Sequence, residues 1–221
     1  MAGKRIEAFI FDLDGVITDT AEYHYRAWKR LAEEEGLSFS RADNEKLRGV
    51  SRRQSLLLIL KDFRPSEEKI EEMMARKNGY YQSFLEQITE ADFLPGAREL
   101  LFQLKSQNYQ LALASASKNA PQVISRLKIE HIFDTISDGN SVQLMKPAPD
   151  LFLHTAKKLD VPPEDCVVIE DARSGIDAAL AAGMFAIGIG PERRVGHAHL
   201  RYERIAGMNL VEVLSTLQGG S

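Results

Sequence analysis

The stretch Asp12-Leu13-Asp14-Gly15-Val16-Ile17 decides which fold this 221-residue chain is predicted to adopt. It follows the apolar, β-favouring run Ile6-Glu7-Ala8-Phe9-Ile10-Phe11, which predicts a buried strand. In an extended backbone, side chains two residues apart point to the same side, so Asp12 and Asp14 are expected to lie close together. Two adjacent carboxylates repel each other, which indicates a bound cation or a group that exchanges protons. A plain Asp-Gly turn is the alternative, and the rest of the chain decides between them.

The composition is that of a globular protein, with 44% apolar and 27% charged residues. A net charge of −4 predicts no general attraction to nucleic acid or to anionic lipid, so a bound anion needs a local site. The longest aliphatic run, Leu56 to Leu60, is too short to span a membrane, and the single cysteine, Cys166, cannot form an internal disulfide. The first strand begins too early to leave room for a signal peptide. We therefore expect a cytoplasmic monomer with no nucleic-acid or membrane partner.

Helical patterns fill the chain between the first strand and residue 92. Apolar periodicity and helix-start residues predict a first helix that follows the N-cap residues Thr18-Asp19-Thr20 and runs to about residue 35. Further helices are predicted at about 43–48, 52–62 and 67–88. This stretch carries no strand pattern. We therefore predict that residues 18–92 form an all-helical cap domain, inserted directly after the first strand.

From residue 93 onward, predicted strands alternate with predicted helices. The strands are expected at 109–114, 135–137, 166–169 and 185–189, and the helices at 97–106, after Asn119, and at 150–159, 174–182 and 210–217. Alternation at this spacing is typical of the α/β class, with a doubly wound parallel sheet. Residues 1–17 and 93–221 are therefore predicted to form one core domain.

Polar residues interrupt the apolar pattern where the predicted strands end. They are Asp12 and Asp14, Ser115 to Asn119, Glu170-Asp171, and Lys146 in the proline-bracketed stretch Lys146-Pro147-Ala148-Pro149-Asp150. Each group alone fits a helix cap or a solvated surface, but the carboxyl ends of parallel strands meet at one edge of a sheet. Four carboxylates at close range need a divalent cation, and oxygen ligands suit Mg²⁺. The serines, backbone N–H groups and lysine would bind a phosphate beside it, and a carboxylate between metal and phosphorus is placed to be a nucleophile.

Asp12-Leu13-Asp14-Gly15-Val16, Ser115, Lys146 and Glu170-Asp171 resemble the four motifs of the haloacid dehalogenase superfamily, in the same order. The resemblance implies a Rossmann-like core in which Asp12 is the nucleophile that becomes an aspartyl-phosphate and Asp14 is the general acid/base. It also implies Mg²⁺ as cofactor, held by Asp12, Glu170, Asp171 and the main-chain carbonyl of Asp14. Ser115 and Lys146 would bind and neutralise the transferring phosphoryl group.

The predicted cap carries a second set of polar residues. Thr20, His24 and Trp28 are spaced four residues apart and share one helix face, although packing against neighbouring helices is the alternative for Trp28. Gly49-Val50-Ser51-Arg52, followed by Ser55, predicts a turn into a helix with an arginine able to clamp a second phosphate.

With Thr18 to His24, Arg76-Lys77-Asn78 and Ser115 to Asn119, these cap residues resemble the sugar phosphomutases of the same superfamily. The resemblance implies an isomerase that interconverts β-D-glucose 1-phosphate and glucose 6-phosphate through a 1,6-bisphosphate. Arg52 would hold the phosphate that is not reacting, His24 would assist Asp14, and Lys77 would contact the sugar. The implied binding set is Thr20, Trp28, Gly49, Val50, Ser51, Arg52, Ser55, Lys77, Ser115, Ala116, Ser117, Lys118, Asn119 and Lys146.

Other functions remain open on the sequence alone. A sugar-phosphate phosphatase of the same superfamily differs only in whether water reaches the phosphorylated aspartate. A dehalogenase has no need of Asp14, a signalling receiver module has no long helical insertion, and Gly188-Ile189-Gly190 lacks the third glycine of a dinucleotide-binding loop. Residues 138–145 depart from the pattern expected before Lys146. The residues around Arg193, Arg194, His197 and His199 match no known motif. They favour a solvated surface loop, with the binding of an anion as the alternative.

Overall fold

The structure, a computed structural model, describes residues 5–219. Within these residues six strands form one parallel sheet in the order β3-β2-β1-β4-β5-β6. The strands are β1 (Ala8–Phe11), β2 (Gln110–Ala114), β3 (Thr135–Ser137), β4 (Cys166–Glu170), β5 (Phe185–Ile189) and β6 (Leu200–Tyr202). The predicted doubly wound parallel sheet is confirmed, with β1 in its interior between β2 and β4.

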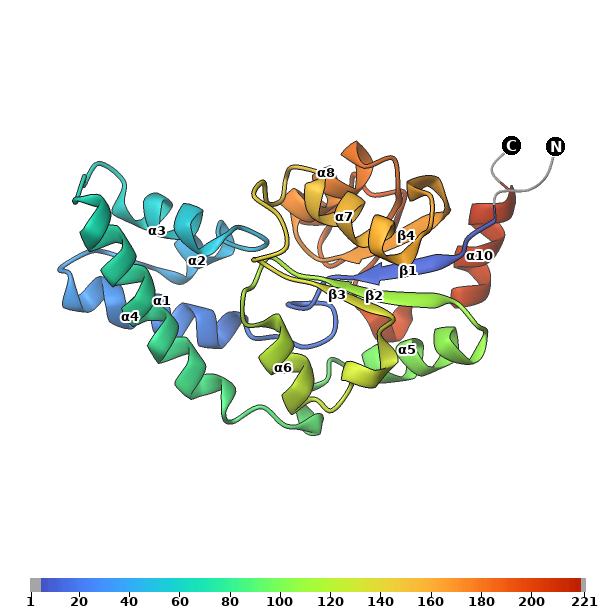
Figure 1. Ribbon diagram of the computed structural model, residues 1–221, viewed down its shortest axis with the longest axis horizontal. Helices are drawn as coiled ribbons and strands as arrows, with labels where there is room; N and C mark the ends of the chain where they lie inside the picture. The colour runs from blue at the N-terminus through green and yellow to red at the C-terminus, as the bar shows by residue number, and fades with distance from the viewer. Residues whose placement is uncertain (1–4, 220–221) are drawn as a thin grey trace.

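Helices cover both faces of the sheet (Figure 1). One face carries α5 (Ala97–Ser106), α6 (Ala120–Arg126) and α10 (Leu210–Gly219), and the other carries α7 (Asp150–Leu159) and α8 (Arg173–Ala181). In β1, Phe9 and Phe11 pack into the first layer, whereas Ala8 and Ile10 pack into the second. A strand buried on both faces needs apolar side chains at every position, which explains the continuous apolar run before Asp12.

Several short elements connect these layers. They are the 3₁₀ turns η1 (Glu90–Asp92), η2 (Glu130–Ile132), η3 (Pro163–Asp165) and η4 (Ile205–Gly207), and the one-turn helix α9 (Glu192–Val195). The strand β6 and the helix α9 were absent from the predicted pattern, because each spans only three or four residues and β6 is only partly buried. No helix within residues 5–219 is long and apolar enough to cross a membrane.

The chain between β1 and β2 forms the helices α1 (Ala21–Glu34), α2 (Arg41–Glu45), α3 (Arg52–Leu60) and α4 (Glu67–Leu85), which gather beside the sheet (Figure 1). They share a hydrophobic core of their own, which includes Trp28, Leu56 and Met73. The inserted all-helical cap of the predicted fold is therefore present. Helix α2 begins earlier than predicted because Ser40 and Asp43 form a reciprocal capping box.

The two connections between this insertion and the sheet lie side by side. The amide of Leu94 donates to the carbonyl of Ile17 at 2.9 Å, and the hydroxyl of Thr18 donates to the carbonyl of Asp92 at 2.7 Å. Thr18 and Phe93 form an isolated antiparallel bridge. The chain thus leaves the sheet for the helical insertion and returns at one place.

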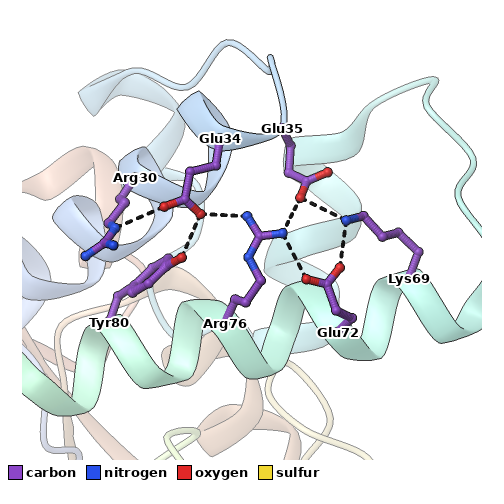
Figure 2. A network of polar contacts seen from close by, with 7 residues as sticks. All are labelled: Arg30, Glu34, Glu35, Lys69, Glu72, Arg76 and Tyr80. Atoms are coloured by element: carbon purple, nitrogen blue, oxygen red, sulfur yellow. Dashed lines mark hydrogen bonds and ion pairs between the residues drawn. The ribbon is translucent and has the colours of Figure 1, made fainter.

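A network of charged side chains joins α1 to α4 on the outside of the insertion (Figure 2). Arg76 lies at its centre and contacts Glu34 at 2.6 Å, Glu35 at 2.5 Å and Glu72 at 2.9 Å. Its other members are Arg30, Lys69 and Tyr80. The side chains on α4 are spaced three or four residues apart, so they share one helix face. Arg76 therefore serves the packing of two helices, although the sequence places it next to Lys77.

Replacing Arg76 with methionine is expected to lower the free energy of unfolding by about 1 kcal/mol, since charge networks that remain partly exposed contribute little each. Urea denaturation followed by circular dichroism measures the change. Arg30→Met removes a guanidinium that pairs with Glu34 in the described structure, and it should cost less. An equal loss in both variants would show that Arg76 has no central role in the network.

Candidate active site

The carboxyl ends of β1, β2 and β4 bring a lysine and two carboxylates together. The buried ammonium group of Lys146 lies 2.5 Å from Asp12 Oδ1, 2.7 Å from Glu170 Oε1 and 3.0 Å from the carbonyl of Ala114. The second Glu170 oxygen accepts the amide N–H of Ala172 at 2.6 Å. Burial alone would lower the pKa of Lys146, but the charges of Asp12 and Glu170 hold it above its usual value. Lys146 is therefore a fixed positive charge beside Asp12.

Asp171 completes a set of three carboxylates with Asp12 and Glu170, and one oxygen from each lies within 4.8 Å of the others. Ligands around one Mg²⁺ ion lie about 3–4 Å apart, because each metal–oxygen bond is about 2.1 Å long. Carboxylate oxygens are also the donors that such a hard cation prefers. Burial, and then the charge of Glu170, raise the pKa of Asp171 well above its usual value. A divalent cation would offset the free-energy cost of keeping these buried, neighbouring carboxylates ionised, so the residues present fit a metal.

Asp14 points from the sheet toward the helical insertion. Its carboxylate accepts a hydrogen bond from the hydroxyl of Thr20, which in turn accepts one from Tyr81 at 3.0 Å. Burial, and then the charge of Asp12, raise the pKa of Asp14 to about 7. Thr20 stands at the N-cap position of α1 but makes no side-chain cap bond there, so the predicted capping role is wrong for this residue. Its hydroxyl is used by Asp14 instead.

The stretch after β2 forms a small loop of donors at the same edge. The amide of Ser117 donates to the Ser115 hydroxyl at 3.1 Å, and the amide of Asn119 donates to the Ser117 hydroxyl at 3.2 Å. These bonds hold the loop in a tight turn that leads into α6. Hydroxyl and amide groups arranged in this way are suited to binding phosphate oxygens.

A cavity of about 640 Å³ lies between this edge and the insertion. Its volume falls in the range typical of small-molecule sites. The predicted site residues that line it are Asp12, Asp14, His24, Trp28, Gly49, Val50, Ser51, Arg52, Ser55, Lys77, Ser115, Ala116, Ser117, Lys118 and Asp171. The other four predicted site residues do not line the cavity. Thr20, Asn119 and Lys146 each contact a lining residue, and Glu170 contacts Lys146.

The partly buried His24 and the buried Lys77 form a pair on the cap side of the cavity. The Lys77 ammonium lies 2.8 Å from His24 Nδ1 and sits over the rings of Trp28 and Tyr81 at 4.8 and 4.6 Å. Burial, and then the charge of Arg52, hold the pKa of Lys77 well below its usual value. Burial, and then the charge of Lys77, hold the pKa of His24 well below its usual value. His24 contacts Lys77 and the ring of Tyr81, whereas Asp14 is contacted by Thr20, so any help from His24 to Asp14 would have to be indirect.

Three residues at the site were not selected from the sequence. Arg48, in the turn after α2, pairs with Asp171 at 2.9 Å. Arg194, expected in a solvated loop, also reaches Asp171, at 3.5 Å, whereas Arg193 beside it is exposed as predicted. Asn78 accepts a hydrogen bond from Asn119 at 2.9 Å, which joins the insertion to the sheet. Of these three, only Asn78 could have been selected from the sequence, because it directly follows Lys77 in the stretch Arg76-Lys77-Asn78 that carries the resemblance.

Gly49 allows the insertion to approach the sheet closely. It adopts a left-handed conformation with φ of +69°, and a Cβ there would lie 2.9 Å from the Cβ of Ala172. A larger residue would be strained and would push the two parts of the molecule away from each other.

Comparisons with known proteins agree with this geometry. The sequence profile of the haloacid dehalogenase-like hydrolases matches residues 9–189. The chain is 50% identical to the β-phosphoglucomutase of Bacillus subtilis (strain 168) over 190 residues, which cover 84% of each chain. It is 31% identical to the phosphorylated carbohydrates phosphatase of Thermotoga maritima, covering 96% of this chain and 99% of that protein. The crystal structure of β-phosphoglucomutase from Clostridium difficile superposes with a TM-score of 0.93 at 44% identity, covering 97% and 98% of the two chains.

Proposed function

The chain belongs to the haloacid dehalogenase-like hydrolase family, and from this premise we propose that it is a phosphomutase acting on β-D-glucose 1-phosphate. It interconverts that substrate and glucose 6-phosphate through β-glucose 1,6-bisphosphate. The observation that carries the proposal is the combination of the Asp12–Lys146–Glu170 edge with a cap cavity that holds Lys77, His24 and Arg52. The edge serves phosphoryl transfer, and the cap side supplies groups for a sugar and a second phosphate.

Asp12 is the proposed nucleophile. In one half-reaction an Asp12 oxygen attacks the phosphorus of the 1-phosphate of β-glucose 1,6-bisphosphate. The bond from that phosphorus to the sugar oxygen breaks, glucose 6-phosphate leaves, and the phosphoryl group stays on Asp12. Lys146 and Ser115 would neutralise and orient that group, which is the main way a protein accelerates phosphoryl transfer. In the other half-reaction the 6-hydroxyl of β-glucose 1-phosphate attacks the phosphorus of phosphorylated Asp12. The bond from Asp12 to phosphorus breaks, which forms the 1,6-bisphosphate and frees the Asp12 carboxylate.

Asp14 is the proposed proton carrier for both half-reactions. It gives a proton to the departing sugar oxygen and removes one from the attacking hydroxyl. A pKa of about 7 suits both tasks, because each protonation state is well populated near neutral pH. Thr20 holds the carboxylate in place, and Thr20 belongs to the insertion. Closure of the proposed cap domain, residues 18–92, over the core of residues 1–17 and 93–221 would therefore set the orientation of Asp14.

Asp12, Glu170 and Asp171 would hold Mg²⁺, together with the main-chain carbonyl of Asp14. Bound there, the ion would supply positive charge for the phosphoryl oxygens. The proposed substrates are small sugar phosphates, and we propose that the protein acts in the cytoplasm as a monomer.

With β-glucose 1-phosphate and a trace of the 1,6-bisphosphate, glucose 6-phosphate is expected to accumulate with little release of inorganic phosphate. The reason is that a closed cap excludes water from the phosphorylated aspartate. Parallel enzymatic assays of glucose 6-phosphate and phosphate measure the ratio, and the α anomer is the matched control substrate. Phosphate release at a comparable rate would favour a phosphatase instead, the activity named for the Thermotoga maritima relative.

A further inference from the structure

Four charged residues form a cluster where the insertion meets the sheet. Glu45 and Arg48 come from the insertion, and Asp171 and Arg194 come from the core. Asp171 Oδ2 lies 2.9 Å from Arg48 and 3.5 Å from Arg194. Glu45 lies 3.4 Å from Arg48 and 3.3 Å from Arg194. Each acid of this Asp171 cluster therefore contacts one arginine from its own part of the molecule and one from the other part.

Arg194 is held in the cluster by the local fold. It lies on α9, directly after β5, and its side chain is mostly buried, at 22% exposed. A Cβ at Gly190 would lie 2.7 Å from its guanidinium, so the glycine leaves the space that Arg194 occupies. The side chain of Asp171 is 4% exposed, so the attraction between these two groups is weakly screened by solvent.

We propose that Arg194 and Arg48 compete with the metal for Asp171, so that metal binding and the contact between cap and core oppose each other. This inference rests on the proposed function, which makes Asp171 a metal ligand. A divalent cation on Asp171 would repel two guanidinium groups that now share one of its oxygens. Once displaced from Asp171, Arg194 and Arg48 would contact only Glu45 in this cluster. The contact between Arg194 and Glu45 would then be the one that still joins the cap to the core there. Coupling of this kind is reciprocal, so a firmer cap contact must weaken metal binding by the same factor.

The test measures metal affinity rather than turnover. Titration calorimetry of the wild-type protein with Mg²⁺, without substrate, gives the reference dissociation constant. Arg194→Met is expected to bind Mg²⁺ more tightly, by a factor on the order of five to ten. Arg193→Met is the matched control, because it removes one positive charge from an exposed neighbour on the same short helix. Its affinity should equal that of the wild type.

A second measurement follows the distance between cap and core. Fluorophores on cysteines introduced at Glu68 and Lys157, both exposed, report that distance, since the natural Cys166 is buried. Addition of Mg²⁺ should change the energy transfer in the wild type, and Glu45→Gln should enlarge the change. This variant leaves Asp171 intact but lacks the contact between Glu45 and Arg194, which in the wild type would still join cap and core after the metal has displaced the arginines from Asp171. This variant should still bind Mg²⁺, with an affinity no higher than that of the wild type, because the two arginines lose Glu45 as a partner and hold Asp171 more firmly.

The possible outcomes separate the two proposals. If Arg194→Met binds Mg²⁺ no more tightly than Arg193→Met, the competition is refuted while the phosphomutase proposal stands. If the wild type neither binds Mg²⁺ nor turns over β-glucose 1-phosphate, the proposed function fails and the competition fails with it. Tighter binding in Arg194→Met, together with a larger distance change in Glu45→Gln, supports the inference.

Discussion

Replacing Asp12 with asparagine is expected to abolish mutase turnover, with a fall of at least about 10⁴-fold, because the amide cannot form the acyl phosphate. The change keeps the size of the side chain and an oxygen that can accept the bond from Lys146, now at 2.5 Å. The fold should therefore survive. A coupled assay for glucose 6-phosphate measures the loss, and intact-mass spectrometry confirms that the asparagine has not deamidated.

Asp19→Asn is the matched control for this variant. Asp19 lies in the same connection, is exposed, and accepts a hydrogen bond from the amide of Ala21. Its replacement should leave most of the activity. Appreciable turnover by Asp12→Asn, with the asparagine intact, would refute Asp12 as the nucleophile.

Replacing Lys146 with methionine is expected to lower the free energy of unfolding by about 3–5 kcal/mol, because it leaves buried carboxylates without their counter-charge. Lys146 contacts both Asp12 and Glu170 and is fully buried, so solvent cannot compensate for its loss. Turnover should fall as well, by at least about 10²-fold, since one fixed charge beside the phosphoryl group is lost. Urea denaturation measures the first effect and the coupled assay the second.

The double variant Asp12→Asn/Lys146→Met is the informative control for the stability effect. It removes one of the two carboxylates left unpaired, so it should be more stable than Lys146→Met alone. Lys157→Met, at an exposed position on α7, should change little. If Lys146→Met unfolds at the same urea concentration as the wild type, the buried ion pairs do not support the fold.

The sheet could be predicted because its strands are buried on both faces. Ala8 to Phe11 and Cys166 to Ile169 have apolar side chains at every position, and their neighbours at the carboxyl end are charged. The strand β6 gave no such signal, because Leu200, Arg201 and Tyr202 lie at the edge of the sheet and are all only partly buried. Pattern alone cannot separate such a strand from a loop.

The part of the site that could be predicted consists of residues that stand at the carboxyl ends of strands. Asp12, Ser115 and Glu170 each come directly at the end of a strand, so the sheet itself brings them together. Arg48 and Arg194 could not be found in this way. Arg48 is 123 residues from Asp171 in the chain, and their meeting depends on how the insertion packs on the core. The capping role predicted for Thr20 was wrong for a related reason. A threonine before a helix usually caps it, but here the hydroxyl donates to Asp14, whose position follows only from the folded structure.

The paired connections at Ile17–Thr18 and Asp92–Leu94 have a consequence for how such enzymes can change over evolution. Because the inserted segment starts and finishes at the same point, another segment with neighbouring ends could replace it without moving any strand. Asp12, Lys146 and Glu170 would keep their places, while the lining opposite them would be new. Under the proposed assignment of the sugar contacts to the insertion, the chemistry and the choice of substrate would be encoded in separable modules, and a graft at this point would test that separation.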